Sequence, residues 1–135
     1  MKAEMFGDEA NPLRALLDIN YPIKEGMIKD NPNHPNGIKG DWEDFEKLWH
    51  YTFHTKMGLP EDLSDKCILV TEAALQPKKN REKMADLIFD KFGFGYVMFE
   101  TQALLSLMAE GKNTGCVLDS GDGVTHIIPV IEGQV

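Results

Sequence analysis

A short acidic and glycine-rich turn between two apolar segments is the part of the chain that could do chemistry. Asp119 follows an apolar segment at residues 116–118, and the turn at residues 120–123 leads into a second one at 124–130. Glycine takes positive φ freely, so the two glycines of the turn could aim backbone N–H groups into one phosphate-binding concavity. A carboxylate at the strand end could hold a hydrated Mg²⁺. The pattern predicts a hairpin that grips nucleotide phosphates, although the same dipeptides also occur in ordinary surface turns.

Two more polar side chains could act with this turn. His126 lies near the start of the second expected strand, and Gln102 follows an expected strand at residues 96–99. Ligands of open α/β sheets bind beyond the carboxyl ends of strands, where both Asp119 and Gln102 fall. With His126, Gln102 could orient a water molecule. A glutamine at a helix start can equally bond to nearby backbone, and that alternative stays open.

The surrounding pattern alternates strands and helices. Beyond the hairpin, strands are expected at residues 66–71 and 96–99, and helices at 80–92 and 101–109. Such alternation is typical of an α/β fold with a mainly parallel sheet. The continuous apolar run at residues 67–70 predicts a strand that is buried on both faces.

The clearest expected helix starts at Asp41, which we interpret as its N-cap. Aromatic side chains then follow at helical spacing, at positions 42, 45, 49 and 53. His50 and His54 are four residues apart, but no further ligand completes a metal site, so solvated or hydrogen-bonded histidines are favoured.

The segments before Asp41 carry weaker signals. Asn11 and Pro12 suggest a helix start, with a short helix or a helix that passes into a strand at residues 16–21. Residues 24–29 could form a short strand. Residues 31–40 are rich in proline, asparagine and glycine and predict an irregular surface loop. Its prolines fall where calcium ligands would alternate, so we do not expect a calcium site.

Composition excludes several classes of partner. The net charge of −8 argues against nucleic acid and against an anionic membrane surface, and no apolar run is long enough for a membrane span. No signal peptide is evident at the start. Cys67 and Cys116 lie in apolar runs, so we expect buried, reduced thiols and a cytoplasmic protein.

Several strings in the chain, in this order, resemble the actin family, and the resemblance covers about residues 6–135. They are Gly7-Asp8-Glu9-Ala10, Tyr21-Pro22-Ile23, Gly26-Met27-Ile28, Asp41-Trp42-Glu43-Asp44, Leu48-Trp49-His50-Tyr51-Thr52-Phe53, Leu69-Val70-Thr71-Glu72-Ala73, Asn80-Arg81-Glu82-Lys83-Met84, Gln102-Ala103-Leu104-Leu105-Ser106 and the hairpin. The strings at Leu13-Arg14 and Phe92-Gly93-Phe94-Gly95 look more like actin-related proteins than conventional actin.

The resemblance implies a partial actin-like ATPase fold of the Hsp70 and sugar-kinase type. We expect mainly one lobe, with a mixed sheet flanked by helices. Residues 1–30 would be the end of the small outer subdomain, residues 41–135 the core of the first lobe, and residues 31–40 an inserted surface loop. Sugar kinases, acetate kinases and Hsp70 proteins share the hairpin, but the strings above are actin-like.

The resemblance also implies roles for individual residues. The residues that would bind the phosphates of ATP or ADP are Asp119, Gly121, Asp122, Gly123 and Val124. Asp119 would hold Mg²⁺ or Ca²⁺ through water, and Gln102, His126 and Asp119 would position the attacking water. Implied partners are actin and other subunits of an actin-nucleating complex, in the cytoplasm and cytoskeleton.

The chain also departs from the family. It begins after the family's first Gly-rich phosphate loop and ends before the second lobe, so only half of a phosphate clamp is expected. Glu25 stands where actin carries a histidine. We therefore leave hydrolysis open and expect the isolated 135 residues to be poorly stable and to bind ATP weakly or not at all. The alternatives are a truncated module that binds partners without hydrolysis, and a divergent conventional actin.

Overall fold

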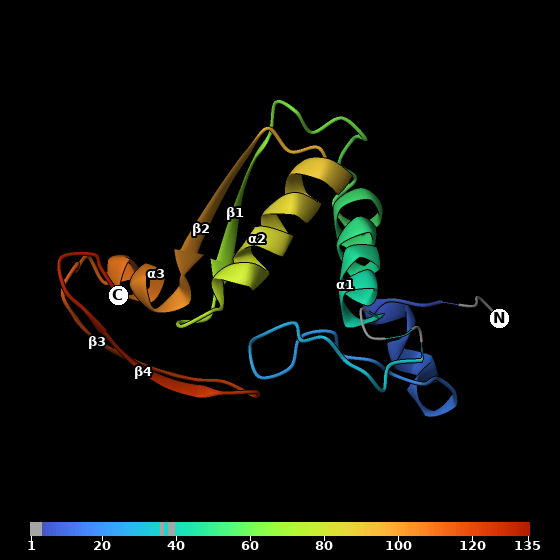
Figure 1. Ribbon diagram of the computed structural model, residues 1–135, viewed down its shortest axis with the longest axis horizontal. Helices are drawn as coiled ribbons and strands as arrows, with labels where there is room; N and C mark the ends of the chain where they lie inside the picture. Colours follow the sequence, from blue (N-terminus) through green and yellow to red (C-terminus); the bar gives the residue numbers. More distant parts are fainter. Residues whose placement is uncertain (1–3, 36, 38–39) are drawn as a thin grey trace. The chain divides into compact units, whose positions relative to one another are not determined.

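A computed structural model of the chain describes residues 4–35, 37 and 40–135 (Figure 1). The chain divides into two compact units, which we describe separately. The first contains residues 1–23 and 28–60, and the second contains residues 24–27 and 61–135. None of the helices in the described residues is long and apolar enough to cross a membrane.

The first unit begins with two short 3-10 helices, Gly7–Glu9 and Asn11–Leu16. The second starts one residue earlier than expected, because its N-cap is Ala10 and not Asn11; Pro12 still lies in its first turn, where a missing N–H needs no partner. The possible strand at 16–21 is wrong: Leu17 to Ile23 is irregular, and Leu16, Ile19 and Tyr21 remain exposed. In the expected loop at 31–40, residues 31–35 and 37 are irregular and Gly40 already belongs to a helix, while residues 36, 38 and 39 lie outside the described residues.

Helix α1, Gly40–His50, continues into the π-helical segment Tyr51–Lys56. The expected aromatic stripe is confirmed, because Trp42, Phe45 and Phe53 are buried and successive rings along the stripe are in contact. The helix begins one residue before the expected N-cap. Asp41 therefore lies in the first turn, where its carboxylate faces the positive end of the helix.

The second unit contains a parallel pair of strands, β1 (Cys67–Glu72) and β2 (Tyr96–Thr101), in the register Cys67↔Tyr96 to Glu72↔Thr101. Helix α2, Lys78–Asp86, extends into a π-helical segment, Leu87–Lys91, and connects the two strands. Figure 1 shows α2 lying along the pair. The β-α-β order that the sequence pattern predicts is thus confirmed.

Strand β1 is not buried on both faces, contrary to the expectation from its apolar run. Exposure alternates along it: Ile68 and Val70 are half-buried, whereas Cys67 and Leu69 are exposed, the latter to 51%. Successive side chains of a strand point to opposite faces, and within the described residues only one face is covered. For the same reason the expectation of buried thiols is wrong, since both cysteines are free and exposed.

Helix α3, Gln102–Ala109, follows β2 directly and packs against an antiparallel hairpin. The hairpin consists of β3, Gly115–Ser120, and β4, Thr125–Val130. Its contact with α3 is an apolar cluster of buried side chains: Ala103, Leu104, Leu107, Ile128 and Val130. The α/β class is confirmed, with the strands arranged as one parallel and one antiparallel pair.

Candidate functional site

The tip of the β3–β4 hairpin carries most of the residues that the sequence singles out. The Gly121 N–H donates to the Val124 carbonyl oxygen at 3.0 Å, which closes the loop. Ser120 Oγ and Thr125 Oγ1 are hydrogen-bonded at 2.9 Å. Asp119 comes directly before this pair on β3 and is exposed. The loop is therefore short, closed and accessible to a ligand.

The expectation that the two loop glycines take positive φ is wrong. Seven glycines have positive φ, and neither Gly121 nor Gly123 is among them. The loop closes through a four-residue turn between Ser120 and Thr125, which needs no left-handed residue. The loop in this structure is thus an ordinary closed turn, and what remains for anion binding is its exposed backbone and the adjacent carboxylate.

Asp119 and His126 are directly paired across the hairpin. His126 lies two residues before Ile128, which belongs to the apolar cluster against α3. Because side chains alternate along a strand, His126 and Ile128 share a face, and Asp119 shares it on the neighbouring strand. The structure therefore brings Asp119 and His126 together on the face of the hairpin that packs on α3.

Gln102 is the first residue of α3 and comes directly after β2. Its Nε2 donates to Thr71 Oγ1 at 3.4 Å. The parallel register places the carboxyl ends of β1 and β2 together, so Thr71 and Gln102 lie at the same sheet end. This is the strand-end position expected from the sequence. The amide of Gln102 thus contacts Thr71, and its backbone carbonyl oxygen accepts a hydrogen bond from Ser106 Oγ at 3.0 Å.

Sequence reasoning missed an ion pair at the same sheet end. Arg81 of α2 makes a two-point interaction with Glu72, the last residue of β1: Nε donates to Oε2 at 3.1 Å, and Nη2 donates to Oε1. The Glu72 side chain is only 9% exposed. The hydrogen bond to Glu72 raises the pKa of Arg81 above its ordinary value. The sequence did mark both residues, because Glu72 and Arg81 each lie in one of the actin-like strings, but it gave no sign that they pair.

A second missed feature is a tight turn beside the hairpin loop. Residues 24–27 form a turn rather than the expected short strand. The Lys24 N–H donates to the Met27 carbonyl oxygen at 2.9 Å, and the Met27 N–H donates to the Lys24 carbonyl oxygen at 3.1 Å. Glu25 and Gly26 both have positive φ, 53° and 74°. A Cβ on Gly123 would lie 4.0 Å from the backbone of Glu25. The turn thus lies next to the loop expected to bind phosphate.

Gly26 is packed on both sides within this turn. A Cβ at this position would lie 3.2 Å from Ala73 Cβ and 3.9 Å from Val124 Cγ2. Ala73 follows the end of β1, and Val124 precedes β4. The turn is therefore in contact with both the sheet end and the hairpin loop. Among residues 4–35, 37 and 40–135, no group of three or more His, Cys, Asp or Glu is placed to hold a metal ion.

His50 and His54 do not form part of this site. Their rings lie 4.7 Å apart on consecutive turns, and His54 Nδ1 lies 3.1 Å from the Leu59 carbonyl oxygen. The His54 ring thus interacts with the chain just after the π-helical segment, as expected of a hydrogen-bonded histidine.

Three known proteins are similar to this chain along all or nearly all of its length. Actin-related protein 2 of Saccharomyces cerevisiae is 46% identical over 135 residues, which are 100% of this chain and 32% of the relative. Actin-related protein 2 of Acanthamoeba castellanii is 45% identical over 133 residues, 98% of this chain and 31% of the relative. Actin-related protein 2 of Schizosaccharomyces pombe is 44% identical over 135 residues, 100% of this chain and 31% of the relative.

The chain thus spans about a third of the length of the curated relatives that it matches. The family model described as Actin matches residues 1–135, the whole of the chain. The resemblance found in the sequence strings is confirmed along its full length. The chain belongs to the actin family.

Proposed function

We propose that this chain is the nucleotide-binding part of an actin-related protein that acts in actin filament nucleation. The observation that carries the proposal is the direct pairing of Asp119 with His126 beside the exposed loop at residues 121–124. The similarity to proteins named actin-related protein 2 supports the choice within the family. Partners would be actin and other subunits of a nucleating complex, in the cytoplasm and cytoskeleton.

The donor set of the hairpin tip suits ATP or ADP with a divalent cation. The loop offers backbone N–H groups from Asp122, Gly123 and Val124, and Asp119 offers a carboxylate for the water shell of Mg²⁺ or Ca²⁺. The bound cation would neutralise phosphate charge. Asp119 would orient its waters, and the loop backbone would hold the phosphates.

His126 and Gln102 are assigned to positioning the attacking water. Phosphoryl transfer to water depends on placement and charge stabilisation more than on covalent chemistry, so an imidazole and a carboxamide are suitable groups. His126 would act from the α3 face of the hairpin, beside Asp119. Gln102 would act from the start of α3, where Thr71 now holds its amide.

We also propose how the chain is divided among the subdomains of an actin-like fold. Residues 1–30 would be the end of the small outer subdomain, residues 41–135 the core of the first lobe, and residues 31–40 an insertion.

Titration of the native polypeptide that contains these residues with MgATP tests the proposal. The variant Asp119→Asn removes the carboxylate at the hairpin, and Asp90→Asn removes an exposed carboxylate of the segment Leu87–Lys91 as a matched control. We expect the first to weaken MgATP binding by about tenfold or more, since a charge-assisted interaction is lost, and the second to leave it unchanged. Equal affinities of the two variants would contradict the proposal.

A module that binds partners without nucleotide is the second candidate. The outer face of the hairpin favours it, because Leu118 and Ile127 are paired across the strands and both are about two-thirds exposed. Under this candidate, wild-type polypeptide would show no MgATP binding in the same titration.

A further inference from the structure

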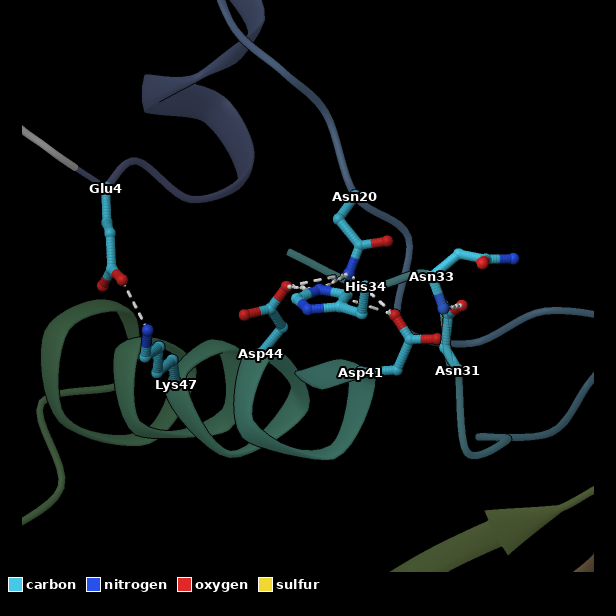
Figure 2. A network of polar contacts seen from close by, with 8 residues as sticks. All are labelled: Glu4, Asn20, Asn31, Asn33, His34, Asp41, Asp44 and Lys47. Carbon is cyan, nitrogen blue, oxygen red and sulfur yellow. Dashed lines mark hydrogen bonds and ion pairs between the residues drawn. The ribbon is translucent and has the colours of Figure 1, made fainter. Parts of the chain in front are cut away.

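Four polar side chains in the first unit meet at the start of α1. Asn20 Nδ2 donates to Asp41 Oδ1 at 2.9 Å and to Asp44 Oδ2 at 2.8 Å. His34 Nε2 lies 3.1 Å from Asp44 Oδ2 and 3.8 Å from Asp41 Oδ1. Figure 2 shows Asn20 and His34 pointing toward the two aspartates of α1. We term these four residues the clasp.

The possible hydrogen-bond donors of the clasp are the Asn20 side-chain amide and the His34 ring. Asn20 Nδ2 has two hydrogens, and both are taken by the aspartates. The role of its third contact, at 3.2 Å with His34 Nε2, depends on the tautomer of the ring. With its hydrogen on Nε2, the His34 ring can donate to Asp44 Oδ2, which lies 3.1 Å away.

Two of the four clasp residues, His34 and Asp41, are shielded from water, whereas Asn20 is exposed. The exposed fractions of the side chains are 5% for His34, 2% for Asp41 and 24% for Asp44. A Cβ at Gly40 would lie 1.8 Å from His34 Nδ1, so glycine at this position leaves the space that the ring occupies. Hydrogen bonds to carboxylates are stronger than those between neutral groups and gain further from shielding, so the buried His34 side chain is the firmer of the two attachments to α1, and Asn20 adds two bonds from an exposed position.

Those two segments lead into and out of the turn at residues 24–27. Three residues separate Asn20 from Lys24, and six separate Met27 from His34. Four residue steps span at most about 14 Å, so a fixed Asn20 limits how far Lys24 can travel. The turn itself is packed on Gly123, Val124 and Ala73 in its own unit. Holding both chain ends also lowers the entropy of the intervening segment.

We propose that the clasp is a built-in restraint on the Lys24–Met27 turn, and that opening it loosens the turn and speeds nucleotide release from the adjacent hairpin. The part on nucleotide release rests on the proposed function, whereas the restraint itself does not. His34 comes from residues 31–40, so this segment would control the turn through one side chain. Asn20 and His34 are positioning residues in this account.

Amide hydrogen exchange in the native polypeptide tests the restraint. Asn20→Ala and His34→Ala each remove one arm of the clasp, and Asn33→Ala is the matched control, an exposed neighbour of His34. We expect exchange at residues 24–27 to become roughly tenfold faster in the first two variants and to stay at the wild-type rate in the third. His34→Gln, whose amide can still donate to Asp44, is expected to restore slower exchange. Wild-type exchange in Asn20→Ala and His34→Ala would overturn the restraint.

The dissociation rate of a fluorescent ATP analogue tests the coupling in the same variants. We expect faster release in Asn20→Ala and His34→Ala, by a factor similar to that seen in exchange, and no change in Asn33→Ala. Faster exchange with an unchanged release rate would overturn the coupling. If the wild-type polypeptide does not bind the analogue, the proposed function fails and the coupling with it, whereas the exchange data still decide the restraint.

Discussion

Asp119 and His126 lie directly opposite each other on β3 and β4, one residue pair before the Ser120–Thr125 pair that flanks the loop. This pairing places a carboxylate and an imidazole side by side at an exposed loop. The arrangement follows from strand register alone, because a one-residue slip would move His126 to the opposite face of the hairpin.

Replacing His126 with alanine is expected to slow ATP hydrolysis by roughly 10- to 100-fold, the scale of misplacing a reacting group, with a smaller effect on MgATP affinity. Ile127→Ala is the matched control, because Ile127 is the next residue and lies exposed on the opposite face. Phosphate release under single-turnover conditions is the measurement. Equal rates in the two variants would remove His126 from the proposed site.

Replacing Gly26 with alanine is expected to lower the free energy of unfolding by more than the same change at Gly58. Both glycines have positive φ, 74° and 64°, so each replacement costs about 1–2 kcal/mol for the backbone conformation. Only at Gly26 does the new Cβ meet a neighbour, Ala73, at 3.2 Å, whereas Gly58 has open space. Urea unfolding followed by circular dichroism measures the difference, and equal losses would argue against this packing.

Replacing Gly40 with alanine is expected to lower stability much more in the wild-type chain than in a His34→Ala background. In the wild-type chain the new Cβ would collide with the His34 ring, so stability falls. In the His34→Ala background the ring is gone, so the collision and most of the loss of stability disappear. A double-mutant cycle in thermal unfolding measures this coupling. Destabilisation of the same size in both backgrounds would show that His34 does not lie over Gly40.

Replacing Arg81 with methionine is expected to cost about 1–3 kcal/mol of stability, because Glu72 is nearly buried and would lose its two-point partner. Lys78→Met is the control: Lys78 and Glu82 form an exposed pair at 3.6 Å on the same helix, worth about 0.5 kcal/mol or less. Chemical denaturation of both variants gives the two values. A similar small loss in each would mean that Glu72 does not depend on Arg81.

The sequence predicts the order of elements well where periodicity is strong. The aromatic stripe of α1, the β-α-β order around α2 and the hairpin at Asp119 all follow from apolar spacing. Periodicity does not show which faces of a sheet are covered by other elements, so the prediction that Cys67 is buried is wrong. Nor does it distinguish α-helix from the 3-10 helix Asn11–Leu16 and the π-helical segment Tyr51–Lys56, which at six residues each are too short for their different numbers of residues per turn to show.

The candidate site likewise contains residues that the sequence could predict and residues that it could not. Asp119, Gln102 and His126 could be predicted because their residue types stand out at strand ends. The turn at residues 24–27 could not, since its position depends on contacts of Gly26 with Ala73 and Val124, which are distant in sequence. The clasp was missed for the same reason: Asn20 and Asp41 are 21 residues apart.

The most direct test of the proposed function is the amount of nucleotide bound to the native polypeptide after purification in Mg²⁺. Nucleotide extracted from wild-type protein and from the Asp90→Asn and Asp119→Asn variants can be identified and quantified by chromatography. The account predicts about one ATP or ADP per chain in wild type and Asp90→Asn, and a large loss in Asp119→Asn. Wild-type protein without bound nucleotide, or full retention in Asp119→Asn, would contradict a nucleotide site at this hairpin.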